Sequence, residues 1–137
     1  MTIDLQWRGA FASAEVENLH GGAVDVARVL RDERRDLRRL VAAHSLGWVT
    51  ARRAGWLVGF VNVPWDGRLH AWIVDVVVDV SLRRLGVGRR LVAAATEGAR
   101  AAGCEWLHVD FEERLRPFYL DACGFTPSAA GLLRLRA

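Results

Sequence analysis

The chain has 137 residues, of which 52% are hydrophobic and 26% charged, a composition typical of one globular domain, so we treat residues 1–137 as a single domain. No apolar run reaches the ~20 residues that a membrane-spanning helix needs, and no basic stretch followed by an apolar core predicts a signal peptide, so we expect a cytoplasmic protein without membrane contact. The net charge of +3 depends on arginine alone, because the sequence contains no lysine, and every mechanism that requires a lysine amine is excluded.

One strand and two helices are predicted at the N-terminal end. Residues 2–8 alternate in polarity as a strand does, and the apolar residues within 11–20 predict a short amphipathic helix that a Gly-Gly pair ends. The mixed charges of residues 31–39 indicate a solvated, salt-bridged helix face or a surface for a charged partner. That longer helix is expected from about Val24, because its apolar residues recur at spacings of three and four: Val26, Val29, Leu30, Leu37, Leu40 and Val41.

Three strands are predicted next. Residues 48–51 and 56–63 flank the segment Arg52-Arg53-Ala54-Gly55, whose glycine is typical of a hairpin turn. A second turn at 64–67 leads into a valine-rich strand over residues 70–80, which we expect to be buried on both faces.

The C-terminal half continues with alternating elements. A helical stripe between residues 91 and 102 ends at Gly103, and a strand over 106–110 follows it. Residues 114–122 predict a helix, and residues 124–125 with 132–136 predict a short terminal hairpin. This order of elements indicates an α/β or α+β domain built on a mixed sheet.

A glycine loop joins the valine-rich strand to the helix after it. Gly86 and Gly88 let the backbone approach an anion, and unpaired amides at the helix start would bind phosphate, with added charge from the arginines at positions 83, 84, 89 and 90. The dinucleotide fingerprint fails because Leu91 stands at its third glycine, and the nucleotide-triphosphate loop fails because there is no lysine.

The segment Arg83-Arg84-Leu85-Gly86-Val87-Gly88 resembles the acetyl-CoA pyrophosphate loop of the GNAT superfamily of N-acetyltransferases. Upstream, Asp75-Val76-Val77-Val78 resembles the fourth strand of that family, and Phe118-Tyr119 through Gly124-Phe125 resembles its C-terminal half. The resemblance covers residues 47–127. It implies a mixed, mostly antiparallel central sheet whose fourth and fifth strands splay apart, flanked by about four helices.

The resemblance also implies acetyl-CoA as co-substrate. Its pantetheine arm would enter between the splayed strands and pair with the backbone of the fourth strand, and the loop amides would cradle its pyrophosphate. The valines could instead be core residues only, and the two loop arginines could be merely exposed. The implied cofactor-binding residues are Val76, Val78, Arg83, Arg84, Gly86, Val87, Gly88 and Arg89.

Tyr119 is the only tyrosine and stands near the position of the family's general acid, which protonates the CoA sulfur. It lies five residues before Gly124, whereas the family spacing of four falls on Leu120. An extra residue or a bulge in the helix would restore the alignment; otherwise Tyr119 is a packed aromatic. Trp72 and Val74 occupy the positions where the family carries a general base, so the base is unassigned.

Two aspartates remain as catalytic candidates. Asp75, a carboxylate in an apolar strand, either makes a structural hydrogen bond or recognises and deprotonates the amine. Asp110, at the end of the next strand, faces the same choice. The four histidines and two separate cysteines have no ligand spacing, so neither a metal site nor a disulfide is predicted.

The implied reaction is direct transfer of an acetyl group to a primary amine of a small molecule or peptide. The alternative is a non-catalytic acyl-CoA-binding sensor or scaffold, which the missing base and the offset of Tyr119 favour. No nucleic-acid partner is expected, because the charges are mixed and no aromatic and basic residues interleave. A homodimer is compatible with the resemblance, and the acceptor and the acyl-chain preference stay open.

Overall fold

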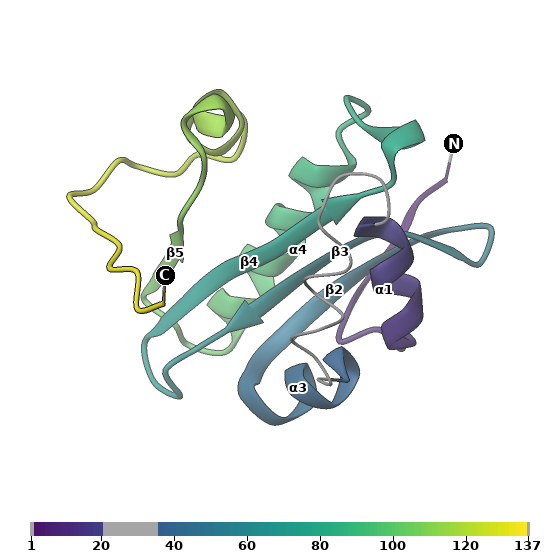
Figure 1. Cartoon of the computed structure of the whole chain (residues 1–137), viewed down its shortest axis with the longest axis horizontal. Helices are drawn as coiled ribbons and strands as arrows, with labels where there is room; N and C mark the ends of the chain where they lie inside the picture. The colour runs from purple at the N-terminus through teal and green to yellow at the C-terminus, as the bar shows by residue number, and fades with distance from the viewer. Residues whose placement is uncertain (1, 21–35, 137) are drawn as a thin grey trace.

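Five strands form one sheet in the computed structural model, which describes residues 2–20 and 36–136 (Figure 1). Each strand from β1 to β4 pairs antiparallel with its neighbour, whereas β4 and β5 are parallel. The prediction of a mixed, mostly antiparallel sheet is therefore confirmed. In sheet order, which is also chain order, the strands are β1 (Asp4–Trp7), β2 (Ser45–Arg53), β3 (Trp56–Pro64), β4 (His70–Val78) and β5 (Trp106–Val109).

Helices cover both faces of this sheet. α4 (Val87–Ala101) packs on one face, and α1 (Ser13–His20) and α3 (Leu37–His44) pack on the other (Figure 1). Within the described residues, no helix is both long and apolar enough to cross a membrane. Three shorter helical segments connect the larger elements: η1 (Val80–Leu82), η2 (Glu113–Leu115) and η3 (Pro117–Ala122).

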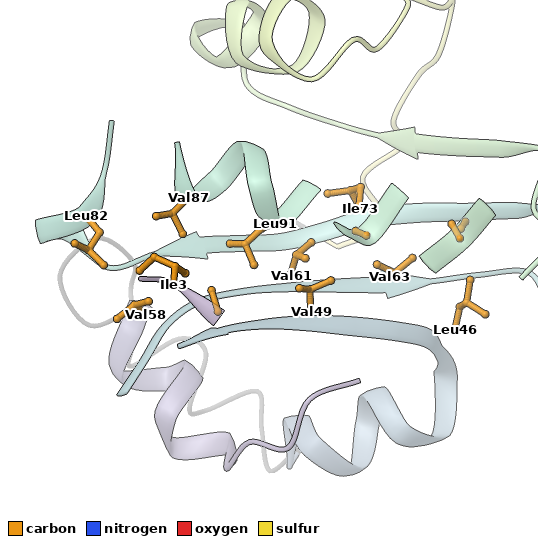
Figure 2. Packing of buried hydrophobic residues seen from close by; sticks show 14 residues of the cluster. Ile3, Leu46, Val49, Val58, Val61, Val63, Ile73, Leu82, Val87 and Leu91 are labelled. Atoms are coloured by element: carbon orange, nitrogen blue, oxygen red, sulfur yellow. The ribbon is translucent and has the colours of Figure 1, made fainter. Parts of the chain in front are cut away.

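Two apolar clusters hold these layers together. Between the sheet and α4, the side chains of Val49, Val61 and Leu91 are completely buried, within the cluster that Figure 2 shows. On the opposite face, Phe60 packs against Phe11, with ring centroids 4.9 Å apart. Burial of one such side chain contributes roughly 1.5–3 kcal/mol, so both clusters hold the central strands firmly in place.

β2 and β3 form the hairpin that the sequence predicts. Its two turn residues, Ala54 and Gly55, have φ of +49° and +83°. Two consecutive residues with positive φ match the right-handed twist of the flanking strands, which is why a glycine is favoured there.

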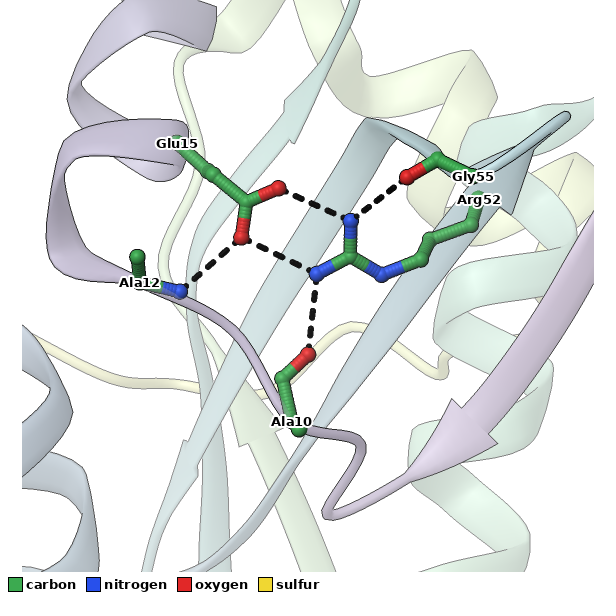
Figure 3. A network of polar contacts seen from close by, with 5 residues as sticks. All are labelled: Ala10, Ala12, Glu15, Arg52 and Gly55. Carbon is green, nitrogen blue, oxygen red and sulfur yellow. Dashed lines mark hydrogen bonds and ion pairs between the residues drawn. The ribbon is translucent and has the colours of Figure 1, made fainter.

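An ion pair joins α1 to this hairpin (Figure 3). The guanidinium of Arg52 donates to both carboxylate oxygens of Glu15, at 2.8 and 3.0 Å, and to the carbonyls of Gly55 and Ala10. These hydrogen bonds from Arg52 lower the pKa of the Glu15 carboxyl to about 2. The pair holds α1 against the sheet, and Leu19 near the end of α1 lines the larger cavity of the candidate site.

β4 is not buried on both faces, so this prediction is wrong. Ala71, Ile73 and Val77 are buried, whereas Asp75 is exposed. The reason lies in the tertiary structure: β5 pairs with β4 only from His70 to Ile73, so the second half of β4 has a neighbouring strand on one side only.

The long helix expected from about Val24 through Val41 is also wrong, because the backbone at Asp36 is extended, with ψ of 106°. Asp36 instead caps α3: its carboxylate accepts a hydrogen bond from the Arg38 amide at 3.1 Å. The rest of that predicted helix, and most of the charged run, fall on residues 21–35, which lie outside the described residues.

Two predictions for the C-terminal third differ from the structure. The helix expected over 114–122 is present but irregular, because the 3-10 segment η2 leads directly into the π-helical segment η3. In place of a hairpin, residues 124–136 contain neither helix nor strand, and Leu132, Leu133 and Leu135 are exposed. Alternating polarity favours a strand only where a neighbouring strand offers it a face to pack on.

Candidate active site

A β-bulge shapes β4 just beyond the point where its pairing with β5 ends. Two residues separate Val74 from Val77 on β4, whereas only one residue separates their pairing partners on β3. Asp75 and Val76 therefore lie together opposite a single residue of β3. Asp75 has φ of +57°, in the left-handed region that residues with side chains rarely adopt. Backbone strain of this kind is concentrated at functional sites, and here it accompanies an exposed carboxylate.

A cavity of about 650 Å³ opens beside this half of β4. Its lining comes from β4, the loop between η1 and α4, and the segments η2 and η3. Four arginines line it and no acidic residue does. Seven of the predicted cofactor-binding residues are among its lining: Val76, Val78, Arg83, Arg84, Gly86, Gly88 and Arg89.

The loop before α4 supplies backbone amides at this cavity. The first backbone hydrogen bond of α4 runs from the Arg90 amide to the carbonyl of Gly86 at 3.1 Å. The amides of Val87, Gly88 and Arg89 precede that bond and have no acceptor within the helix. These three amides and the positive end of the helix dipole form an arrangement that binds phosphate groups.

Two residues of this region direct their side chains away from the cavity. The side chain of Val87 is 2% exposed and packs in the core, so only its backbone can reach a ligand. Arg90 turns away from the cavity, and its guanidinium donates to the carbonyl of Ile3 at 3.2 Å. The expectation that Arg90 adds charge around the loop is therefore wrong, because this arginine holds the start of the chain against α4.

The π-helical segment η3 determines which side chain faces the cavity. The Cys123 amide donates to the Phe118 carbonyl, five residues earlier, and the Phe125 amide donates to the Tyr119 carbonyl, six residues earlier, both at 3.0 Å. A π-turn contains one residue more than an α-turn, which accounts for the offset of one residue that the sequence shows. As a result Tyr119 lines the cavity, whereas Leu120 does not.

Three phenylalanine rings hold Tyr119. Phe111 stacks on it with centroids 5.1 Å apart, and Phe118 and Phe125 contact it edge-on at 4.8 and 5.9 Å. The residue is 6% exposed, and burial, with a smaller effect from Cys123, raises the pKa of its phenol. The hydroxyl makes no hydrogen bond to any residue in the described ranges. A buried phenol that keeps its proton and lines a cavity is suited to donate that proton.

A second, smaller cavity of about 210 Å³ is lined by β4, by the residue after β5 and by Tyr119. Asp75 and Asp110 contribute two carboxylates, and no basic residue lines it. Trp72 and Val74, the two positions that lack the family's base, also belong to its lining.

Val76 and Tyr119 line both cavities, so the two spaces adjoin at these residues. The charges separate there, with arginines in the larger cavity and carboxylates in the smaller one. Asp75 and Asp110 thus line the same small cavity as Tyr119, and the loop before α4 lies around the connected larger space. Within the described residues, no group of three metal-ligating side chains comes together.

Known proteins share this architecture. The acetyltransferase (GNAT) family matches the chain over residues 13–125. The chain belongs to the GNAT family. An acetyltransferase from Trypanosoma brucei has the same fold, with a TM-score of 0.80 at 23% identity over 99% of this chain and 100% of that chain.

Two further similar proteins are named with a substrate or ligand. The glucosamine 6-phosphate N-acetyltransferase of Trypanosoma brucei brucei is 42% identical over 53 residues, which are 39% of this chain. The match spans 36% of that relative's length, about a third. AAC(6')-Iy in complex with the bisubstrate analog CoA-S-monomethyl-acetylneamine matches with a TM-score of 0.69 at 21% identity, over 100% of both chains.

Acetyl-CoA is the acetyl donor of the GNAT family, to which the chain belongs. The larger cavity fits this molecule, which carries a pyrophosphate and a further phosphate at one end and a thin, largely apolar arm at the other. Four arginines and three free amides suit the phosphates, and the valines of β4 suit the arm.

Sequence reasoning missed the part of the cavity that comes from distant segments. Leu19 of α1 and Leu82 of η1 line it, as do Arg114 and Leu115 of η2. Arg114 adds a fourth cation, and the only signal for it was a basic residue shortly after the strand that ends at Val109. Its position depends on where η2 lies relative to β4 and the loop before α4, which no local pattern encodes.

Proposed function

We propose that the protein transfers the acetyl group of acetyl-CoA directly to a primary amine of a small molecule or a peptide. The observation that carries this proposal is a pair of cavities with opposite lining charges that share Val76 and Tyr119. Arginines suit the phosphates of the donor, and carboxylates suit an amine acceptor. Direct transfer requires the two reactants to meet at one place, and the shared residues lie where the cavities adjoin.

In this proposal the loop before α4 binds the phosphates. The amides of Val87, Gly88 and Arg89 hold the pyrophosphate, and the guanidinium groups of Arg83 and Arg84 neutralise its charge. The backbone amides make the main contacts, since they are held rigidly by the first turn of α4.

The free edge of β4 holds the pantetheine arm. Pairing with β5 ends at Ile73, so the backbone groups of Val76 and Val78 on that side are free to hydrogen-bond with the amides of the arm. Their side chains pack against the core beside α4, so core packing and cofactor binding are compatible in the same two residues.

The donor supplies an activated acetyl group: an amide bond forms to the acceptor nitrogen as the carbon–sulfur bond breaks. The nitrogen loses one proton and the sulfur gains one. Tyr119 donates the proton to sulfur and recovers one from solvent, and Asp75 or Asp110 accepts the proton of the amine.

Two measurements on the full chain test this function. In thermal unfolding, acetyl-CoA at a hundred times its Kd should stabilise the native protein by about 2.7 kcal/mol. With a panel of amines, thiol release from acetyl-CoA should rise above the rate without amine. A thermal shift without amine-dependent thiol release supports the alternative, a non-catalytic acyl-CoA-binding sensor or scaffold, and the absence of any shift contradicts both.

A single domain over residues 1–137 and a cytoplasmic location are parts of the same proposal. Cys104 and Cys123 are both free thiols, as is usual in a reducing compartment. Fluorescence microscopy of the tagged protein tests the location.

A further inference from the structure

The smaller cavity holds more negative charge than one reacting amine needs. Asp75 and Asp110 both line it, and no arginine or histidine does. Neither carboxylate makes a hydrogen bond or ion pair with any residue in 2–20 or 36–136, whereas Glu112 and Glu113, just after Asp110, are each paired with an arginine. Asp75 and Asp110 are both exposed, and two such carboxylates beside one small cavity suit a ligand that brings positive charge.

Tyr119 adds a hydrogen-bonding group where this cavity adjoins the larger one. Its side chain is 94% buried, since only 6% is exposed, and it lines this cavity. Its hydroxyl has no hydrogen-bond partner in the part of the chain that the structure describes. Buried hydroxyls are almost always hydrogen-bonded, so this one is expected to find its partner in a bound molecule or water.

Two histidines hold Trp72, which lines the cavity. The Trp72 indole stacks on the imidazole of His108, with centroids 4.9 Å apart and 18° between the planes. His108 is in turn hydrogen-bonded to His70, at 2.8 Å between Nε2 and Nδ1. An indole beside two carboxylates attracts ammonium groups, through cation–π interaction and through ion pairing.

Resting on the function proposed above, we propose that the acceptor is a small diamine or polyamine, with a second ammonium group and no phosphate. The reacting nitrogen must be neutral to attack, and one carboxylate suffices to accept its proton. The other carboxylate then pairs with the second ammonium group, which keeps its charge throughout the reaction.

A phosphorylated acceptor fits this cavity poorly. Its phosphate would face Asp75 and Asp110 with no lining cation to balance the three groups. This chain therefore differs in expected substrate from its relative named as a glucosamine 6-phosphate N-acetyltransferase.

Two matched pairs of amines test the proposal by thiol release from acetyl-CoA with the full chain. Putrescine and butylamine differ only in the second amino group, and we expect kcat/KM to be at least about tenfold higher for putrescine. Glucosamine and its 6-phosphate differ only in the phosphate, and we expect the unphosphorylated sugar to react at least about tenfold better. Equal rates within the first pair, or faster reaction of the phosphorylated sugar, overturn the proposal.

The variants Asp75→Asn and Asp110→Asn identify the carboxylate that holds the second ammonium group. The variant that loses the partner of the second ammonium group should lower kcat/KM for putrescine but not for butylamine, so the preference for putrescine disappears. The variant that loses the proton acceptor should lower kcat/KM for both amines. Asp121→Asn is the control, because Asp121 is exposed and lines neither cavity. A preference that survives in both variants contradicts this role for the two carboxylates.

Calorimetric titration of putrescine into the protein with bound CoA gives a readout that needs no turnover. We expect binding that weakens at least about tenfold in Asp75→Asn or Asp110→Asn and is unchanged in Asp121→Asn. Absence of putrescine binding in protein that binds acetyl-CoA overturns this inference but leaves the donor site intact. Failure to bind acetyl-CoA contradicts the proposed function itself, so the two failures are distinguishable.

Discussion

The amide of Phe125 donates to the carbonyl of Tyr119 at 3.0 Å, across six residues of chain. This wide turn follows the π-helical segment η3 and places the phenol, in place of the neighbouring Leu120 side chain, at the junction of two cavities. A change of one residue in a turn thus decides which side chain can act on a ligand.

Tyr119→Phe should lower the rate of thiol release by about 10²-fold, because the phenol is the proposed proton donor to sulfur. The thermal shift with acetyl-CoA should be unchanged, since the ring and its contacts with Phe111 remain. Burial raises the pKa of Tyr119, so wild-type activity should persist into alkaline pH and fall as the phenol ionises, and the variant should lack that fall. A wild-type rate in the variant would leave Tyr119 as a packed aromatic.

Gly86→Glu should abolish binding of acetyl-CoA, because a carboxylate and added bulk would occupy the space of the pyrophosphate. Gly55→Glu is a matched control: both glycines have φ near +80°, and an added Cβ would meet no atom within 4 Å at either position. The strain of about 1–2 kcal/mol should therefore be similar in both variants. Equal acetyl-CoA affinity of the two folded variants in calorimetry would contradict the phosphate-binding role of the loop.

Arg114→Gln should weaken acetyl-CoA binding by about three- to tenfold, because its guanidinium is one of the cations that line the larger cavity. Arg116→Gln, two residues away, should leave the affinity unchanged: both arginines pair with a glutamate, but Arg116 does not line the cavity. Calorimetry with both variants separates a local contact from a general effect of charge. Similar losses in the two variants would point to the general effect.

Glu15→Gln should lower the free energy of unfolding by about 1 kcal/mol at neutral pH, as expected for a bidentate, partly exposed ion pair. The pKa of Glu15 is lowered from 4.5 to about 2 in the folded chain, so the stabilisation is present above the unfolded pKa and is lost as the pH falls from 4.5 toward 2. Urea unfolding of both proteins across this range should show their stabilities converging. A difference that stays constant with pH would contradict the role of the charged pair.

Several features of the fold and the site could be predicted because short segments encode them. The hairpin turn at Ala54 and Gly55 requires two positive φ values, which these residues tolerate. Gly86 and Gly88 before an amphipathic helix indicate a candidate phosphate-binding loop, since the first amides of a helix have no acceptor within the helix. The expectations about the acetyl donor and about the rest of the fold came from the resemblance of the motif residues to the GNAT family.

Other features depended on contacts between segments far apart in the chain. The valine-rich sequence of β4 predicted burial on both faces, but its second half is open because β5 stops pairing at Ile73. The alternation of leucine and arginine near the C-terminus predicted a strand, but residues 124–136 pair with no other strand.

The sequence by itself determined which residues are candidates for the chemistry: the glycine loop, the lone tyrosine, the two aspartates and the arginines that take the place of lysine. Only the tertiary structure decided how they combine. The bulge at Asp75, the π-turn before Cys123 and the end of the β4–β5 pairing bring Asp75, Asp110 and Tyr119 around one small cavity. The physical reason is that backbone geometry and charge are local properties, whereas burial and the shape of a cavity are set by whichever strands and helices pack beside them.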